Sequence, residues 1–466
     1  MRLRPVRAGS ALAAVVLLAA CSGGSGGRGS DGAAVRPYAY PTAPAAPTGP
    51  LDAVVEGALE RLAVSLGGGA LDRAALDGVA GSGDARLGWF VADLLRFVPG
   101  GDDRQALVAA FVQLTGLDPA PDPAFAASPW HSITNHLIAW DLPAEPGYRE
   151  HKALLFEQVE PGWKPFFDDP RSVIDWRLVS WGGVFIDDRP LGDPRGCARG
   201  CIPALDDPAL TDTSGGDWYG DDRVVFGVVV GGEAVAFPKN IMQVHEMVNM
   251  TIGGRRVAIP YCTLCGSAQA YFTDSAASGP GALVLRTSGL LSRSNKVMYE
   301  LTTQSVFDTF TGRAVSGPLH DAGVVLDQAT VVVSRWGDWK RAHPDTRIVA
   351  RDGGIGRSYP DDPLRGRDDN GPIFPIGPAD PRLPVQAPVL GVIGPDGTPI
   401  AFPVDQATAA LADHEPVAVG RVEVVADGSG LRARVQGGGE LATHEAFWFA
   451  WSQFHPDTIV WTPLSR

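Results

Sequence analysis

Residues 236–272 hold the side chains whose types and spacing best suit chemistry. Cys262 and Cys265 are separated by two residues, so their thiols can close a redox disulfide or bind one thiophilic metal ion together. His245 lies in the same stretch and is a candidate further ligand. No other stretch of the sequence concentrates soft or titratable ligands so densely. We therefore expect the chemistry of this protein at Cys262, Cys265 and His245.

A second close pair, Cys197 and Cys201, leaves three interpretations of the cysteines open. In the first, the two pairs form local or crossed disulfides that only stabilise the fold. In the second, Cys262 and Cys265 bind zinc or copper, and either His245 or Cys197 and Cys201 complete a roughly tetrahedral set. In the third, Cys262 and Cys265 cycle between dithiol and disulfide. Because the two pairs are far apart in the sequence, only the fold decides between these interpretations.

Four further polar residues are candidates to support such a site. Glu246 and Asn249 could orient a metal-bound His245, and Glu246 could instead act as a general base. The sequence predicts a short helix here, in which His245 and Asn249 share one face because they are four residues apart. Ser288 and Asn295 are candidates to line the same cleft.

Several common functions are not supported by the sequence. No G-x-S-x-G elbow lies between a predicted strand and helix, which argues against a serine hydrolase. No Walker loop or G-x-G-x-x-G loop precedes a helix, which argues against a nucleotide site. The net charge of −14 leaves no basic field for phosphates, so nucleic acid and anionic membrane surfaces are not expected as partners.

The N-terminus carries the features of a bacterial export signal. Three arginines precede an apolar run over residues 11–20 that is too short to span a bilayer. The run ends Leu-Ala-Ala-Cys at Cys21, which looks like a lipobox, the signal for attaching diacylglycerol to that cysteine. We therefore predict a signal peptide over residues 1–20 and a lipid anchor at Cys21, on the extracytoplasmic face of a bacterial cell membrane.

The remaining sequence divides into three parts by composition and periodicity. Residues 21–50 are rich in Gly, Ser and Pro and are predicted to form a disordered linker. Apolar residues over 51–165 fall at helical spacing and predict a small helical module. Over 166–466, short β-branched runs are bounded by Gly, Asp or Pro, which is typical of strands. The predicted fold class is therefore α+β, with the helical module followed by a β-rich domain.

Two segments of the β-rich part recur in the same order. Residues 228–238 read as a hairpin with Gly-Gly at its turn, and residues 391–403 match it through the final Ala-Phe-Pro. The segment from Trp339 to a His-Pro-Asp-Thr sequence is likewise repeated from Trp451. We predict an internal duplication whose copies span about residues 224–350 and 389–462.

The ordered motifs of about residues 195–465 resemble a family of exported prokaryotic proteins, the domain of unknown function 3179 family. The matching segments lie at residues 202–206, 232–238, 245–249, 261–265, 288–299 and 336–346. The signature of this family is a Tyr-Cys-Pro-Leu-Cys loop, in which this sequence has Thr263 in place of the proline. Cys197 and Cys201 are additions to the family pattern. The resemblance implies export and a shared fold but brings no known reaction.

These observations predict a membrane-anchored extracytoplasmic lipoprotein whose partner is the lipid bilayer, reached through Cys21. We expect a metal-binding or thiol-redox site around Cys262, Cys265 and His245. The alternative is a non-enzymatic envelope protein, for binding or structure, whose cysteines form stabilising disulfides. The sequence identifies neither a substrate nor a protein partner.

Overall fold

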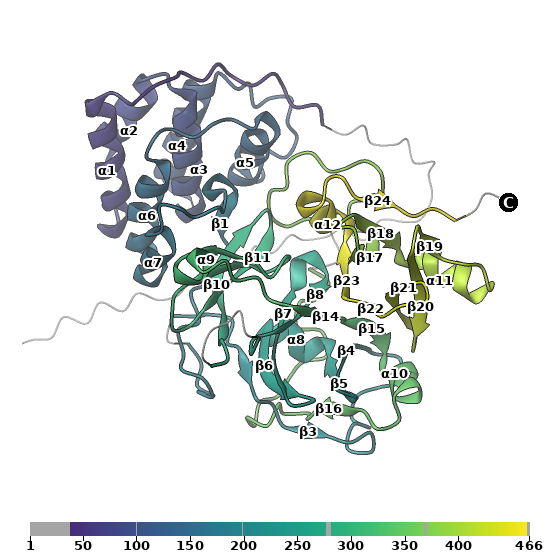
Figure 1. Cartoon of the computed structure of the whole chain (residues 1–466). Helices are drawn as coiled ribbons and strands as arrows, with labels where there is room; N and C mark the ends of the chain where they lie inside the picture. Colours follow the sequence, from purple (N-terminus) through teal and green to yellow (C-terminus); the bar gives the residue numbers. More distant parts are fainter. Residues whose placement is uncertain (1–37, 99, 198, 276–280, 368–370, 464–466) are drawn as a thin grey trace, which may run out of the picture. The chain divides into compact units, whose positions relative to one another are not determined.

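The structure is a computed structural model that describes residues 38–98, 100–197, 199–275, 281–367 and 371–463 (Figure 1). The predicted signal peptide, Cys21 and residues 21–37 of the predicted linker lie outside these ranges. The chain divides into two units, Met1–Ala39 and Tyr40–Arg466, and every helix and strand described below belongs to the second. None of the described helices is long and apolar enough to cross a membrane.

The chain begins with helices, and aspartates cap the first two of them. Asp52 and Asp72 accept hydrogen bonds from the backbone N–H groups of Val54 and Ala75, which satisfies donors that have no partner within the helix. The helices of this part are α1 (Ala53–Gly67), α2 (Arg73–Gly81), η1 (Ala85–Leu87), α3 (Gly88–Phe97), α4 (Gly101–Thr115), α5 (Pro129–Trp140), α6 (Tyr148–Val159), η2 (Pro161–Trp163) and α7 (Lys164–Phe167).

Residues 40–50 fall within the predicted linker, and they form no helix or strand in the described chain. They nevertheless contact the helices. The indole N–H of Trp140 donates to the carbonyl oxygen of Pro41 at 2.7 Å, and Arg86 donates to the carbonyl oxygen of Gly49 at 3.0 Å. This end of the predicted linker therefore packs on the helical part.

The helical part shares its hydrophobic core with the first β-sheet. Phe156 of α6 belongs to one cluster of buried side chains with Tyr299 of that sheet. The Lys152 ammonium is fully buried, and it donates to the Asp93 carboxylate at 2.9 Å and to the carbonyl oxygen of Val179 at 2.6 Å. Because the Lys152 side chain is fully buried, water does not compete for these hydrogen bonds. They therefore hold α6 against Val179, at the start of the β-rich part.

Two sheets contain the strands that carry the candidate residues Asn249, Cys262, Ser288 and Asn295. The first has the strand order β1-β10-β11-β12-β13, and the second has the order β14-β9-β7-β6-β2 with β8 paired to β7. The strands of the first sheet are β1 (Val179–Trp181), β10 (Leu285–Ser292), β11 (Asn295–Glu300), β12 (Val306–Asp308) and β13 (Ala314–Ser316). The strands of the second sheet are β2 (Leu205–Asp206), β6 (Met247–Ile252), β7 (Arg255–Cys262), β8 (Ser267–Ala268), β9 (Ala270–Phe272) and β14 (Gln328–Ala329).

Two further sheets share one pattern of pairing. Their strand orders are β15-β4-β5-β16-β3 and β23-β17-β18-β24. In each, an antiparallel hairpin (β4–β5 or β17–β18) is extended by an antiparallel strand on one side and a parallel strand on the other. Their strands are β3 (Leu210–Thr211), β4 (Val224–Val230), β5 (Glu233–Pro238), β15 (Val332–Arg335), β16 (Arg347–Val349), β17 (Pro388–Ile393), β18 (Pro399–Pro403), β23 (Thr443–Phe447) and β24 (Ile459–Val460).

Matching helices follow the strands of these two sheets. Helices α8 (Lys239–His245) and α11 (Val404–Ala412) follow the two hairpins, and α10 (Trp336–Ala342) and α12 (Trp448–Phe454) precede the two parallel strands. The indole N–H of Trp339 in α10 donates to the Thr346 hydroxyl at 2.9 Å. The indole N–H of Trp451 in α12 donates to the Thr458 hydroxyl at 2.8 Å.

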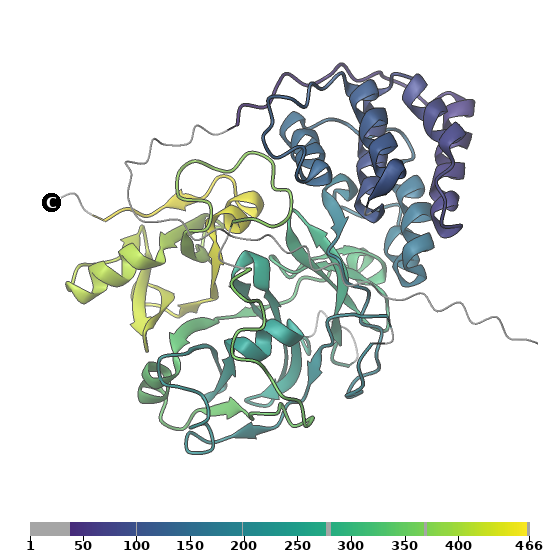
Figure 2. The same cartoon turned by 180° about the vertical axis from the view of Figure 1, so that it is seen from behind.

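A fifth sheet and the short helices α9 and η3 (Trp176–Leu178) belong to the β-rich part as well. The sheet has the order β19-β20-β21-β22, and α11 packs against its two central strands (Figures 1 and 2). These elements are β19 (Ala418–Val419), β20 (Val422–Asp427), β21 (Gly430–Val435), β22 (Glu440–Leu441) and α9 (Pro318–Asp321). The fold is thus of the α+β type, with helices first and sheets after them.

The predicted helix through His245 and Asn249 is wrong. Helix α8 ends at His245, because Glu246 adopts the left-handed conformation with φ of 51° and donates its N–H to the carbonyl oxygen of Met242. The next residues form β6, in which Asn249 pairs with Ala258 of β7. His245 and Asn249 therefore lie on different elements and share no helix face.

Candidate functional site

The two motif cysteines lie at the closed end of a hairpin. Strand β7 ends at Cys262, and the 3₁₀-helix η4 (Thr263–Cys265) turns the chain. Gly266 follows with φ of 61°, a conformation that favours glycine, and β8 then runs back along β7. Cys262 is 3% exposed and Cys265 is fully buried, and both carry free thiols. The fold thus presents two reduced thiols inside the protein.

The Cys265 thiol donates a hydrogen bond to the carbonyl oxygen of Ser294 at 3.2 Å. Ser294 lies in the turn between β10 and β11, so the thiol site joins the first two sheets. Burial raises the pKa of the Cys265 thiol well above its usual value, and hydrogen bonding with the nearby Cys262 thiol raises it further. Deprotonation of Cys265 therefore needs a neighbouring base or a bound cation.

A buried ion pair lies beside the thiols. The Lys296 ammonium is 2.8 Å from a carboxylate oxygen of Glu246 and 2.7 Å from its backbone carbonyl oxygen. The other carboxylate oxygen accepts the Thr263 hydroxyl at 2.9 Å, which links the pair to the cysteine loop. The Glu246 carboxylate raises the pKa of the Cys265 thiol and the Lys296 ammonium lowers it, so both charges act on that sulfur.

Aromatic side chains from two parts of the chain enclose the cysteine loop. Cys262 and Cys265 belong to one buried cluster with Phe310, Trp448 and Trp451. Trp448 and Trp451 lie on helix α12, which directly follows strand β23 of the sheet β23-β17-β18-β24. The cysteine loop therefore packs against the part of the chain predicted to be the second copy, and the aromatic rings keep water from the thiols.

His245 lies elsewhere and uses both of its ring nitrogens. Nδ1 donates to the carbonyl oxygen of Pro203 at 2.7 Å, and Nε2 accepts the Tyr359 hydroxyl at 2.7 Å. Burial lowers the pKa of His245 to about 4, so the ring is neutral at neutral pH. These contacts give the histidine a role in packing the segment around Pro203.

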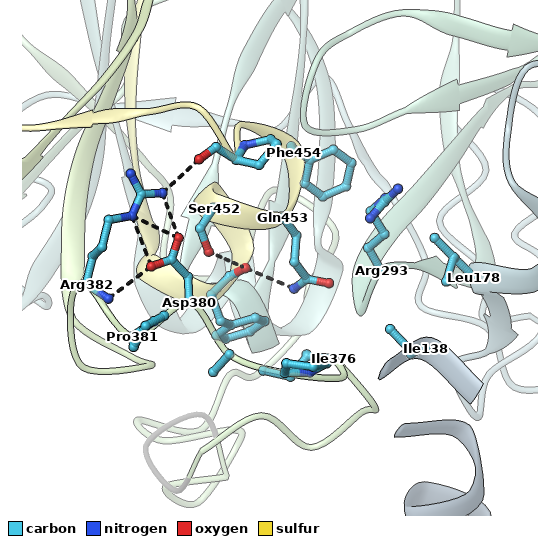
Figure 3. Close-up of a pocket in the computed structure, with 14 residues that line it drawn as sticks. Ile138, Leu178, Arg293, Ile376, Asp380, Pro381, Arg382, Ser452, Gln453 and Phe454 are labelled. Atoms are coloured by element: carbon cyan, nitrogen blue, oxygen red, sulfur yellow. Dashed lines mark hydrogen bonds and ion pairs between the residues drawn. The ribbon is translucent and has the colours of Figure 1, made fainter. Parts of the chain in front are cut away.

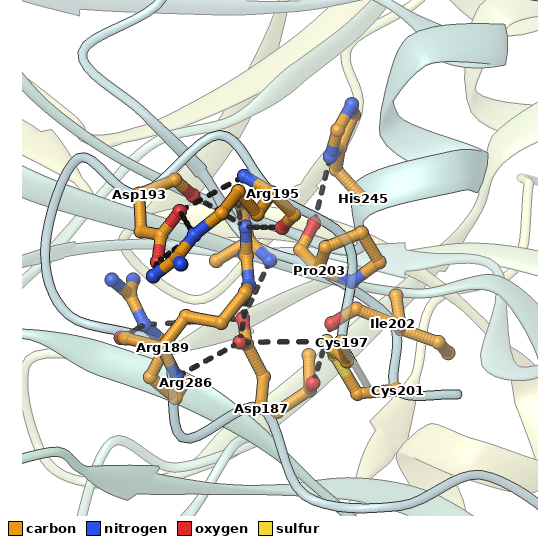
Figure 4. The surroundings of a disulfide bond; sticks show 12 residues. Asp187, Arg189, Asp193, Arg195, Cys197, Cys201, Ile202, Pro203, His245 and Arg286 are labelled. Atoms are coloured by element: carbon orange, nitrogen blue, oxygen red, sulfur yellow. Dashed lines mark hydrogen bonds and ion pairs between the residues drawn. A yellow bond between two sulfur atoms is a disulfide. The ribbon is translucent and has the colours of Figure 1, made fainter. Parts of the chain in front are cut away.

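Cys197 and Cys201 form a disulfide with each other, with their Cα atoms 5.4 Å apart (Figure 4). A disulfide at this pair is thus confirmed. The neighbouring Asp187 carboxylate is held by Arg189, whose Nε lies 2.7 Å from it. Figure 4 shows His245 reaching the same segment through Pro203. This disulfide therefore closes a small loop next to a buried ion pair.

The described residues contain two groups of three ligands close enough to hold one metal ion. They are Asp169, His320 and Asp321, and Asp187 with Cys197 and Cys201, of which the second group offers no thiolate while its cysteines form the disulfide. Neither group includes Cys262, Cys265 or His245. The structure therefore does not gather the tetrahedral set that the sequence suggested for zinc or copper.

Of the three remaining candidates, only Asn295 lies by the thiols. It follows Ser294, and its buried amide nitrogen has no hydrogen-bond partner among the described residues. Asn249 instead donates to the Asp206 carboxylate at 3.0 Å, and Ser288 donates to the carbonyl oxygen of Val297 at 2.6 Å. These last two side chains connect strands within the sheets.

Lys296 is the residue of this site that the sequence reasoning missed. It lies in β11, in which all six residues are buried. Lysine is almost never fully buried without a partner, and the only signal in the sequence was that Lys296 directly precedes the apolar residues at 297–299. Its partner Glu246 is fifty positions earlier, which is why the pair itself could not be found by spacing.

Comparison with known proteins identifies the family. The model of the family described as Protein of unknown function (DUF3179) matches residues 199–439, which is more than half of the chain and includes the cysteine loop, Glu246 and Lys296. No curated protein matches the chain, and no solved structure matches it. The chain therefore belongs to the DUF3179 family.

Proposed function

We propose that this protein is an extracytoplasmic lipoprotein in which Cys262 and Cys265 form a dithiol–disulfide redox site. The observation that carries this proposal is the buried Glu246–Lys296 pair beside two buried free thiols. A carboxylate next to a thiol of raised pKa can accept its proton, and the Lys296 ammonium holds the Glu246 carboxylate in place beside the cysteine loop.

The proposed reaction is an exchange with the disulfide of a small acceptor, R–S–S–R. Cys262 loses its proton, its thiolate attacks one acceptor sulfur, and the first leaving thiolate takes up a proton, which gives a mixed disulfide and one R–SH. Glu246 then takes the proton of Cys265, and the Cys265 thiolate attacks the Cys262 sulfur. The second R–S⁻ leaves and takes that proton, so two electrons move to the acceptor. A small acceptor suits Cys262, which is 3% exposed.

A redox titration tests this proposal. The purified full chain is equilibrated with mixtures of reduced and oxidised glutathione, and of reduced and oxidised dithiothreitol for the most reducing points, then quenched with acid, alkylated and analysed by peptide mass spectrometry. We expect the peptide carrying Cys262 and Cys265 to convert in one two-electron step between about −120 and −300 mV, the range of exchange-active disulfides. The same step is expected after replacing both Cys197 and Cys201 by serine, because that disulfide is a separate pair.

Two results would count against the redox site. If both thiols stay reduced across the whole range, the pair does not cycle. If protein purified without chelator carries one equivalent of zinc or copper that protects both thiols from alkylation, the metal interpretation replaces the redox one.

Lipidation at Cys21 is the other part of the proposal and rests on the lipobox-like sequence before it. Cells expressing the protein are grown with radiolabelled palmitate. We expect label on the wild-type chain and none on Cys21→Ser, because Cys21 is the proposed attachment site. Cys197→Ser is the matched control and should keep the label. Equal labelling of Cys21→Ser would place the lipid elsewhere.

An internal duplication accounts for the second half of the chain. It is supported by the common pairing pattern of the third and fourth sheets and by the matching Trp339–Thr346 and Trp451–Thr458 hydrogen bonds. On this proposal the cysteine loop is an insertion in the first copy. The second copy then supplies the aromatic cover over the thiols through Trp448.

A further inference from the structure

A cavity of about 810 Å³ is shown in Figure 3, and its lining residue Arg293 directly precedes Ser294, whose carbonyl oxygen accepts a hydrogen bond from the Cys265 thiol. Its walls come from α5, from the turn between β10 and β11, from α12 and from the loop before β17. Its apolar lining includes Ile138, Leu178, Ile376, Phe449 and Phe454. Its volume lies within the range of pockets that enclose small organic molecules.

Arg293 gives this cavity a positive charge. Arg293 and Ser294 adopt left-handed conformations with φ of 51° and 63°, which form the tight turn that directs Arg293 between Gln453 and Leu178 (Figure 3). No ion pair or side-chain hydrogen bond of its guanidinium is found among the described residues. The turn thus places an exposed cation above an apolar wall, and its charge also interacts with the Asp308 carboxylate.

The other charges of the cavity neutralise one another. The Arg382 guanidinium lies 2.6 Å from the Asp380 carboxylate and also donates to backbone carbonyl oxygens of Pro456 and Thr458. A smaller cavity of about 220 Å³ shares Arg293 with the larger one and contains the Asp308 carboxylate. An anionic ligand would therefore place its charge on the side of Arg293 that faces the larger cavity, away from Asp308.

We infer that the larger cavity binds an organic anion, a carboxylate carried on an apolar body. The guanidinium of Arg293 matches a carboxylate in charge and in its two parallel donors. The aliphatic and aromatic walls remove the apolar body from water. This site goes beyond the proposed redox function and requires no chemistry of the thiols.

Calorimetric titration with three eight-carbon probes tests the inference. The full chain carrying Cys21→Ser is titrated with octanoate, octanamide and octylammonium, which share chain length and differ in charge. We expect octanoate to bind at least about tenfold more tightly than octanamide, and octylammonium to show no binding, because only the carboxylate forms a charge-assisted pair with Arg293.

Two substitutions and one control locate the binding site. Arg293→Gln should weaken octanoate about tenfold and leave octanamide unchanged. Ala379→Trp, at an exposed position lining the cavity, should obstruct part of it and weaken binding of both octanoate and octanamide. Arg313→Gln removes an exposed arginine that does not line the cavity and should bind octanoate like the parent chain.

The inference is overturned if octanoate does not bind at millimolar concentration, or if it binds with equal affinity to Arg293→Gln or Ala379→Trp. Binding of octylammonium as tight as that of octanoate would also overturn it. Cys262→Ser should keep the octanoate affinity, so failure of the redox proposal and failure of this one can be told apart.

Discussion

Replacing Lys296 by methionine should lower the free energy of unfolding by about 3–5 kcal/mol, the cost of leaving one charge of a buried pair without its partner. The Lys296 side chain is 5% exposed and that of Glu246 is 12% exposed, so little water can take the place of the ammonium at the carboxylate. The Glu246 backbone carbonyl would lose a donor as well. Urea denaturation followed by circular dichroism measures the change.

Two controls distinguish the cost of leaving a buried charge without its partner from the cost of merely removing a lysine. Lys340→Met removes a lysine whose partner Asp221 is 63% exposed, and it should cost less than about 1 kcal/mol. The double variant Lys296→Met/Glu246→Gln should recover most of the loss, because it removes both charges together. A Lys296→Met variant no less stable than Lys340→Met would show that Glu246 is solvated in the folded protein.

The part of the site that could be predicted from the sequence is the part held by local structure. Cys262 and Cys265 are three positions apart and close one turn, so their proximity follows from the chain itself. His245 appeared to belong with them because it precedes them closely. The left-handed Glu246 instead ends α8, and the histidine side chain meets Pro203 and Tyr359 on segments far away in the sequence.

The same distinction holds for the fold. The Gly231-Gly232 turn of the β4–β5 hairpin was predictable, because both glycines take positive φ and a two-residue turn requires it. The pairing of β1 with β10 joins residues more than a hundred positions apart, and no local pattern encodes it. Lys152 of α6 donates to the carbonyl oxygen of Val179 in β1, and the helices bury side chains in one cluster with the first sheet, so the two predicted modules share one core.

Gly391→Ala should destabilise the protein by about 3 kcal/mol, the upper part of the range for overpacking a filled core. Gly391 lies in β17 directly under the indole of Trp451, and an added methyl group would overlap with that ring. Gly227 of β4 lies under Trp339 in the same way, so Gly227→Ala should cost a similar amount. Gly439→Ala is the control, because nothing surrounds a methyl group there, and it should leave stability nearly unchanged.

The reason for these losses can be tested by making room for the methyl group. Trp451→Leu alone opens a cavity and destabilises the protein, but in that background Gly391→Ala should cost little, since the overlapping ring is gone. The double-mutant cycle is expected to give a coupling of at least about 1 kcal/mol, and the Gly227/Trp339 cycle should have the same sign. Additive costs in either cycle would mean that the tryptophan is not what excludes a side chain at that glycine. Coupling in one sheet but not in the other would argue against equivalent packing in the two sheets, and with it against the proposed duplication.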